Sequence, residues 1–223
     1  MFSTAEENYL KAIYKIAQST GDQNVSTKNI AKELSTTPAS VTDMIQRLSE
    51  KELLSYEKYY GVVLTKEGQK LAILLLRKHR LWEVFLHDKL GFTWDEVHEV
   101  AEQLEHIQSS LLIDRLDAFL GFPKFDPHGD PIPNSQGSFT YRIQMPLSEF
   151  HQKGKTVSVL GVKRHQNDFL QYLDLLDLKP GKTIKIINVV DYDKSLEIDI
   201  ENGKKVTISH QIAQDILVRP LED

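Results

Sequence analysis

The chain has 223 residues, of which 40% are hydrophobic and none is cysteine, so disulfides, thiolate nucleophiles, zinc knuckles and iron–sulfur clusters are excluded. The formal net charge of −5 does not suggest nucleic-acid binding, but residues 1–75 carry nine basic and nine acidic side chains, so charge decides neither for nor against DNA. The N-terminus is acidic and polar, and no apolar run approaches the roughly 18 residues of a membrane span, which predicts a cytoplasmic protein.

Residues 1–70 carry the pattern of a winged helix-turn-helix. Ser3 and Glu6 form a capping box that starts an amphipathic helix, and a short helix begins at Ser26. Another begins at Thr37-Pro38, because proline is well tolerated at the first helical position. Segments 53–60 and 62–65 are rich in Tyr, Val and Leu and meet at Gly61, as in a β-hairpin. Two short helices followed by a hairpin are typical of this DNA-binding fold.

In such a fold the second short helix enters the DNA major groove. The side chains expected to contact DNA lie at the exposed start of this helix, further along it, and on the wing: Thr37, Pro38, Ala39, Ser40, Thr42, Asp43, Gln46, Arg47, Lys58 and Tyr59. Units of three helices and a hairpin also serve as protein-docking modules. The pattern alone therefore leaves protein docking open as an alternative.

Residues 71–140 are predicted to form a helical domain. Thr65 could cap a long helix that runs to about residue 87, and Thr93 with Glu96 forms a second capping box. A further apolar helix is expected over about 110–120. Three apolar helices after a DNA-reading module suit a dimer interface, because palindromic sites demand two-fold symmetry.

Residues 147–223 show a different pattern, after a proline-rich linker region over 121–144. Short strands are expected at 157–160, 183–190, 196–200, 205–208 and 216–219, with a brief helix at 167–176. This arrangement predicts a small five-stranded barrel of the SH3 type. The fold class is thus mainly α, with a small β domain at the C-terminus.

The strongest chemical signal is a polar stripe on the predicted middle helices. His98, Glu102, Glu105 and His106 are spaced so that they share one helical face. His79 and Glu83 stand four apart on the preceding helix. Residues of these types on neighbouring helices could surround one or two divalent cations.

Two other interpretations of these residues have to be weighed. A His and a Glu four apart on a helix are more often a solvated ion pair than a ligand pair. Paired carboxylates and imidazoles can also carry out metal-assisted hydrolysis. The chain lacks a His-Glu-x-x-His motif, a nucleophile elbow and a phosphate-binding glycine loop, so we expect a sensor rather than an enzyme.

Several segments together resemble one family of metalloregulators. They are Ser40-Val41-Thr42, the wing sequence of residues 56–65, Arg77-Lys78-His79-Arg80-Leu81, Glu105-His106 and the distinctive run Asp126-Pro127-His128-Gly129-Asp130-Pro131-Ile132-Pro133. On these residues the chain resembles the diphtheria-toxin-repressor and manganese-transport-regulator family. The resemblance covers residues 1 to about 135 closely, and the remainder resembles the SH3-like, FeoA-like domain of the longer members.

The resemblance implies a homodimer that binds divalent metal and then a palindromic double-stranded DNA operator, repressing genes of manganese or iron homeostasis. It implies two metal sites per subunit. The first would use Asn8, Glu102, Glu105 and His106. The second would use His79, Glu83 and His98, with His165 and Asp168 from the C-terminal domain.

Three positions depart from the family pattern. Glu102 stands where iron-type members have Cys, which favours Mn²⁺ over Fe²⁺ because a carboxylate is a hard ligand. Asn8 replaces Met or Asp and leaves a neutral amide oxygen. Lys11 replaces a Glu that completes a closely spaced metal pair in short manganese-type members, so a second cation there is disfavoured.

The predicted function is a manganese-dependent transcriptional repressor, with Fe²⁺ as the alternative metal. A metal-storage or docking protein that does not bind DNA is the alternative function.

Overall fold

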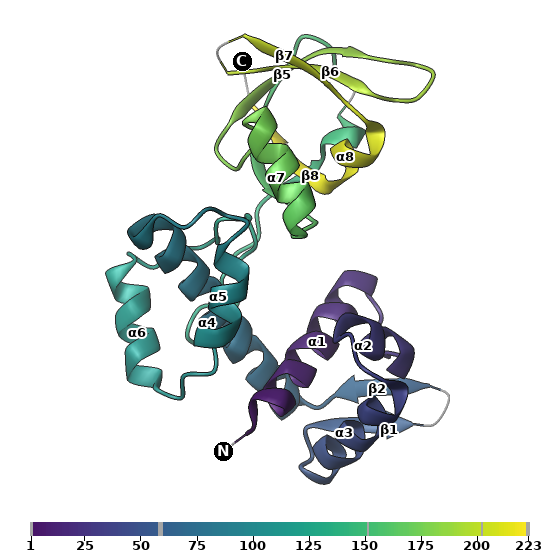
Figure 1. Ribbon diagram of the computed structural model, residues 1–223, viewed down its shortest axis with the longest axis vertical. Helices are drawn as coiled ribbons and strands as arrows, with labels where there is room; N and C mark the ends of the chain where they lie inside the picture. Colours follow the sequence, from purple (N-terminus) through teal and green to yellow (C-terminus); the bar gives the residue numbers. More distant parts are fainter. Residues whose placement is uncertain (1, 58–59, 151, 202, 222–223) are drawn as a thin grey trace. The chain divides into compact units, whose positions relative to one another are not determined.

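The computed structural model describes residues 2–57, 60–150, 152–201 and 203–221. The chain forms two compact units, and α4 belongs to both (Figure 1). The first unit contains Met1–His79, Glu102–Arg115 and Pro133–Phe139, and the second contains Arg80–Ala101, Leu116–Ile132 and Thr140–Asp223. These units are defined by contacts in space, whereas the three domains expected from the sequence are consecutive segments. The three-domain division therefore stays a prediction.

The first unit begins with the elements of the expected winged helix-turn-helix. Helix α1 spans Thr4–Thr20, α2 spans Thr27–Glu33 and α3 spans Pro38–Glu50, followed by an antiparallel pair of strands, β1 (Leu54–Glu57) and β2 (Gly61–Leu64). The capping box at Ser3 and Glu6 is present in full, with hydrogen bonds of 3.0 and 3.3 Å. Ser26 and Thr37 cap the next two helices through their hydroxyl groups.

One apolar core holds these elements together. It contains Leu10 and Ile13 of α1, Ile30 of α2, and residues of α3 and both strands, all almost fully buried. Gly61 brings the wing against this core, since its φ is +110° and a Cβ there would lie 2.8 Å from the carbonyl oxygen of Val25. A side chain at this position would break the paired hydrogen bonds between Val25 and Val62.

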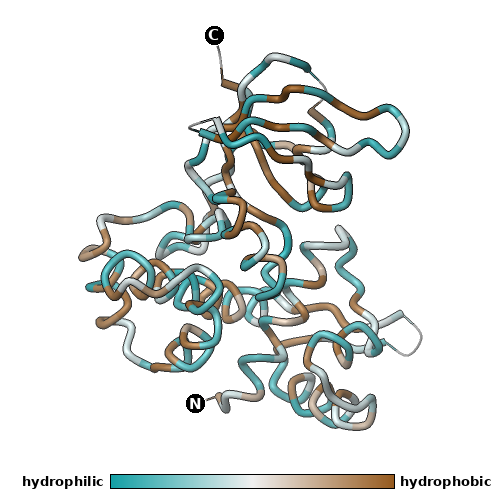
Figure 2. Tube along the Cα trace, turned by 45° about the horizontal axis from the view of Figure 1, so that its top comes forward, coloured by the Kyte–Doolittle hydropathy of each residue, from teal (hydrophilic) through white to brown (hydrophobic). Residues whose placement is uncertain are grey.

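Three helices follow the wing. Helix α4 spans Lys66–Leu90, three residues longer than expected, α5 spans Val97–Leu104 and α6 spans Ser110–Phe119. Glu96 accepts a hydrogen bond from the Thr93 backbone at 3.0 Å, which is one of the two bonds of the expected box, and α5 itself begins after Glu96. Hydrophobic and hydrophilic residues alternate along the helices and strands, as the tube in Figure 2 shows. No helix in the described part of the chain is long and apolar enough to cross a membrane.

The C-terminal part of the second unit is a six-stranded antiparallel sheet in the order β3-β8-β4-β5-β6-β7. The strands are β3 (Met145–Pro146), β4 (Thr156–Val162), β5 (Thr183–Val189), β6 (Leu196–Ile200), β7 (Lys204–Ile208) and β8 (Ile216–Pro220). Helix α7 spans Asn167–Leu176, as the sequence predicts. The two-residue strand β3, the short 3₁₀ helix at Leu147–Glu149 and helix α8 (His210–Asp215) were not predicted.

The expected closed barrel is not observed. Over the described residues β3 and β7 are the edges of the sheet, and no pairing joins them. The inward faces of the strands and α7 form one core, which also contains Trp94 from the segment before α5. Trp94 is only 4% exposed, so a residue of the predicted helical domain is built into the core of the sheet.

Candidate metal centre

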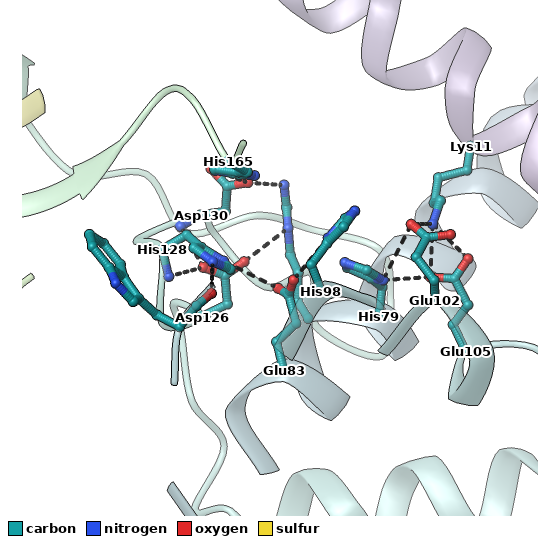
Figure 3. Close-up of polar contacts among 12 residues, drawn as sticks. Lys11, His79, Glu83, His98, Glu102, Glu105, Asp126, His128, Asp130 and His165 are labelled. Carbon is teal, nitrogen blue, oxygen red and sulfur yellow. Dashed lines mark hydrogen bonds and ion pairs between the residues drawn. The ribbon is translucent and has the colours of Figure 1, made fainter. Parts of the chain in front are cut away.

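Glu105 lies at the middle of a buried polar cluster in the first unit (Figure 3). It directly follows α5, and its side chain is 0% exposed. Lys11 of α1 donates from Nζ to both Glu105 carboxylate oxygens, at 2.6 and 2.8 Å, and to Glu102 Oε1 at 2.6 Å. The Nδ1 atom of His79 on α4 lies 2.6 Å from Glu105 Oε2. Three helical segments therefore converge on one pair of carboxylates.

His106 and Asn8, two of the expected ligands, also lie in this unit. The Nδ1 atom of His106 is 2.5 Å from Glu7 Oε2. Its buried Nε2 makes no hydrogen bond and lies 3.7 Å from Glu105 Oε1. The side-chain oxygen of Asn8 is likewise buried and accepts no hydrogen bond. Since buried polar atoms are rarely without a partner, the unpartnered Asn8 oxygen and the unpartnered His106 nitrogen near Glu105 fit ligands of a divalent cation.

Two residues of this cluster call for comment. His79 was assigned to the second site, and its ring nitrogen lies 2.6 Å from Glu105 Oε2, so that His79, Glu102 and Glu105 offer ligand atoms within 4.8 Å of one another. His79, Glu83 and His98, three of the residues expected at the second site, likewise offer ligand atoms within 4.8 Å of one another. Lys11 was expected only to disfavour a second cation. The structure places its ammonium group directly on the carboxylates of the first site.

A second group of potential ligands lies in the second unit and contains Glu83, Asp126 and His128, again within 4.8 Å of one another. The Nε2 atom of His128 lies 2.6 Å from the carbonyl oxygen of Trp94. A carbonyl can only accept, so Nε2 carries the proton and donates it. The other ring nitrogen, Nδ1, lies 3.7 Å from Glu83 Oε2. The lone pair of a neutral His128 would therefore be directed toward the carboxylates.

The carboxylates of this group are buried close together, and the buried Arg80 contacts two of the neighbouring acids, with Nε 3.5 Å from Asp126 Oδ2 and Nη2 3.0 Å from Asp130 Oδ2. Burial raises the pKa of Asp126 to about 8, with further contributions from the charges of Asp130 and Glu83. Burial alone would lower the pKa of His128, but its interactions with Glu83 and Asp126 outweigh this and raise the pKa to about 9. A divalent cation would satisfy the carboxylates in place of these protons.

Two sequence-predicted ligands lie beside this group. His98 places Nδ1 3.3 Å from Glu83 Oε1. His165 stacks on the ring of His128 with 4.7 Å between centroids, and its Nε2 is 3.9 Å from Asp130 Oδ2. Asp168 is exposed, and its Oδ1 accepts from the backbone N–H of Phe169 at 2.8 Å, which is the behaviour of a helix-start residue.

Sequence reasoning did not assign ligand roles to Asp126 and His128. Both lie in the Asp-Pro-His-Gly-Asp segment, which was noted only for its resemblance to the family. The signal was available, since a carboxylate and an imidazole flank a proline in this segment, and a second carboxylate, Asp130, follows. Helical spacing could not find them, because the segment is irregular and lies far from Glu83 in sequence.

The expected DNA-reading face is solvent-exposed wherever it is described. In α3 the apolar residues Val41, Ile45 and Leu48 are buried. The expected contact residues Thr37, Pro38, Ala39, Ser40, Thr42, Asp43, Gln46 and Arg47 are all exposed. Lys58 and Tyr59, expected on the wing, lie outside the described residues.

Comparison with known proteins agrees with this geometry. Residues 1–62 match the family model for the N-terminal DNA-binding domain of iron-dependent repressors, residues 65–134 match the model for their metal-binding and dimerisation domain, and residues 145–220 match the FeoA domain. The HTH-type transcriptional regulator MntR of Oceanobacillus iheyensis is 38% identical over 120 residues, which are 54% of this chain and 80% of the relative. The chain belongs to the iron-dependent repressor family.

Solved structures of other repressors extend the similarity over nearly the whole chain. A manganese-dependent transcriptional repressor in complex with manganese is 32% identical, with a TM-score of 0.83, covering 97% of this chain and 100% of that one. ScaR with bound Cd²⁺ is 36% identical, with a TM-score of 0.77, covering 97% and 99%. This member of the iron-dependent repressor family is a metal-dependent, DNA-binding transcriptional repressor and not an enzyme.

Proposed function

We propose that this repressor is activated by Mn²⁺ bound at Asn8, Glu102, Glu105 and His106. The observation that carries the proposal is the buried Glu105, which lies beside Glu102 and 3.7 Å from the unpartnered Nε2 of His106. The side-chain oxygen of Asn8 is also buried and without a hydrogen bond. All four ligands are oxygen or imidazole nitrogen, and three are oxygen, which suits manganese better than thiol-seeking metals. Fe²⁺ is the alternative, because metal availability also decides which ion such a site holds.

The chain's own residues would couple this site to DNA binding. Asn8 lies on α1, the first helix of the predicted DNA-binding domain, while Glu105 and His106 follow α5. A bound divalent ion would supply a positive charge shared by ligands from both segments. The Glu7 carboxylate orients the His106 imidazole from the α1 side. Ligands from two elements make metal binding and the ordering of α1 thermodynamically linked.

We further propose a second metal site per subunit at Glu83, Asp126 and His128, with His165 beside it. Its support is the spacing of the ligand atoms, together with the raised pKa values of Asp126, caused mainly by burial, and of His128, caused by Glu83 and Asp126. The set expected from the sequence was His79, Glu83, His98, His165 and Asp168. Glu83 is common to both sets. The sequence-based set, of which His79, Glu83 and His98 offer ligand atoms within 4.8 Å of one another, is the alternative proposal for the second site.

The remaining parts of the proposal concern partners and organisation. We propose that α3 inserts its exposed face into the major groove of a palindromic operator, and that the chain binds it as a cytoplasmic homodimer. The support is the family model for residues 65–134, which describes a dimerisation domain. We also propose the three domains 1–70, 71–140 and 147–223, the last an SH3-like (FeoA-like) domain, on the basis of the three separate family-model matches.

The test is DNA binding measured by fluorescence anisotropy during a Mn²⁺ titration. The wild-type chain should bind operator DNA only above a threshold concentration of Mn²⁺. Glu105→Gln and His106→Ala should remain folded dimers but lose the metal response. Metal binding without any DNA binding would instead favour a storage protein. An unchanged metal response in either variant would refute the first-site assignment.

A further inference from the structure

Lys11 makes an unusual set of contacts for a lysine next to a proposed metal site. Its side chain is 8% exposed, and its Nζ lies within 2.6–2.8 Å of three carboxylate oxygens on Glu102 and Glu105. Figure 3 shows the ammonium group between the two carboxylates. An ammonium has three donors, so these contacts satisfy all of them. The lysine therefore neutralises the carboxylates in the same way that a cation would.

The position of Nζ conflicts with that of a metal ion on the same oxygens. Transition-metal ions bind carboxylate oxygens at about 2.0–2.2 Å, so an ion that shared these oxygens would lie only a few ångströms from Nζ. Two positive charges this close repel strongly in a buried site. The carboxylates of Glu102 and Glu105 can thus bind the metal fully only when the lysine withdraws.

A second lysine in the same unit provides a comparison. Lys51 Nζ lies 2.5 Å from Glu6 Oε1, but the Lys51 side chain is 44% exposed. Lys51 can therefore exchange its carboxylate for water at little cost. Lys11 is enclosed, and leaving the cluster requires its ammonium to find a new polar environment. Displacing the Lys11 ammonium from the carboxylates therefore costs more free energy than displacing that of Lys51.

We propose that Lys11 is an internal cation that occupies the first metal site in the metal-free repressor and competes directly with the incoming divalent ion. The inference rests on the proposed function for the ligand set Asn8, Glu102, Glu105 and His106. Lys11 lowers the apparent metal affinity and so raises the metal concentration at which the repressor responds. In the metal-free protein, Lys11 also connects α1 to Glu105. In the metal-bound protein, the metal ion would make this connection.

The test compares Mn²⁺ affinity, by isothermal titration at one pH, for the full chain and its variants. Lys11→Met and Lys11→Gln remove the competing charge and should bind Mn²⁺ at least about tenfold more tightly, because charge-assisted hydrogen bonds to two carboxylates no longer have to be broken. Lys11→Arg keeps the charge and should keep weak binding. Lys51→Met is the matched control, with the same loss of charge and of an ion pair to α1, and should bind Mn²⁺ as the wild type does.

A second measurement covers the possibility that the neutral variants fold poorly. The melting temperature of metal-free Lys11→Met should fall below that of the wild type, and saturating Mn²⁺ should raise it by more than it raises that of the wild type. Wild-type or weaker Mn²⁺ affinity in both neutral variants would overturn the role of Lys11. Unchanged Mn²⁺ binding by Glu105→Gln would instead show that the site itself is misassigned.

Discussion

The imidazole of His106 is hydrogen-bonded to the carboxylate of Glu7, with 2.5 Å between Nδ1 and Oε2. The contact therefore connects the first turn of α1, which carries Glu7, to the segment after α5, which carries Glu105 and His106. Since a carboxylate accepts, Nδ1 must be the protonated nitrogen, and Nε2 is left as the potential ligand atom. A hydrogen bond of this kind fixes both the tautomer and the orientation of a metal-binding histidine.

Glu7→Gln should therefore weaken Mn²⁺ binding by about 10- to 100-fold without unfolding the chain, as loss of such orienting partners does in other metal sites. Glu7 also accepts from Gln108 Nε2 at 2.8 Å. Gln108→Ala removes that bond and a 3.2 Å bond to the His106 backbone carbonyl oxygen, but it keeps the contact between Glu7 and the His106 imidazole, so it is the matched control. Equal effects of the two substitutions on Mn²⁺ affinity would mean that Glu7 does not act through His106.

Arg47 and Gln46 are neighbouring exposed residues of α3, and we expect them to contribute to DNA binding in different ways. Arg47→Ala should weaken binding to all sequences alike and reduce the slope of log affinity against log salt by about one, as loss of a phosphate contact does. Gln46→Ala should instead alter the preferred base, because glutamine amides read base edges. Salt titrations on operator and random DNA distinguish these outcomes, and a sequence-dependent effect of Arg47→Ala would contradict the phosphate assignment.

The second site should bind metal more tightly as the pH rises. Binding requires Asp126 and His128 to release protons, and their pKa values in the metal-free protein are raised to about 8 and about 9. Affinity should thus increase as the pH rises through this range and level off above it. The measurement is Mn²⁺ titration of Glu105→Gln, in which only the second site remains. Proton release is obtained from titrations in buffers with different ionisation enthalpies, and no release at pH 7 would contradict the proposed ligands.

His165 and Asp168 were expected to act together on the second site, and their surroundings now separate them. His165→Ala removes the ring stacked on His128 and should weaken metal binding at that site. Asp168 is exposed and accepts from its own helix, so Asp168→Ala should leave metal affinity unchanged. Isothermal titration of the two single variants tests this. A larger loss for Asp168→Ala would restore the pairing expected from the sequence.

Truncation after Ser138 should cost stability as well as metal affinity. The truncated chain loses the core around Trp94 and the hydrogen bond, 2.8 Å long, from Arg142 to the carbonyl oxygen of Gly129. Exposing a buried tryptophan should lower the melting temperature by several degrees. Thermal unfolding followed by Trp fluorescence tests this directly. An unchanged melting temperature would show that the sheet contributes nothing to the stability of the rest.

Local patterns in the sequence were sufficient to predict most of the helices and strands. Helix α7 begins and ends where expected because an apolar face repeats with helical spacing between residues 167 and 176. The short helix α8 was not predicted, because its six residues are too few to show an apolar repeat with helical spacing. Strand β3 has two residues, too few to show alternation.

The metal-site residues were predicted only where they share a helix or the resemblance names them. Glu102, Glu105 and His106 were found by spacing. The pairing of His79 with Glu105, and of His128 with Glu83, depends on how separate segments pack, which spacing does not encode. The contact of Lys11 with both carboxylates was missed for a chemical reason. A lysine in a helix is expected to extend into solvent, and only the fold reveals that this one is enclosed.

The loop that carries His128 lies directly against β4. A Cβ on Gly129 would come within 2.3 Å of the Leu160 carbonyl oxygen, and one on Gly161 within 2.5 Å of the His128 carbonyl oxygen. That same His128 oxygen accepts from the Val162 N–H at 2.9 Å, just beyond an irregularity in the pairing of β4 with β8 between Val159 and Gly161. Inserting or deleting one residue in β4 would turn the Val162 amide to the opposite side of the sheet. The alignment of two strands in the C-terminal sheet therefore sets the position of an imidazole that belongs to neither strand.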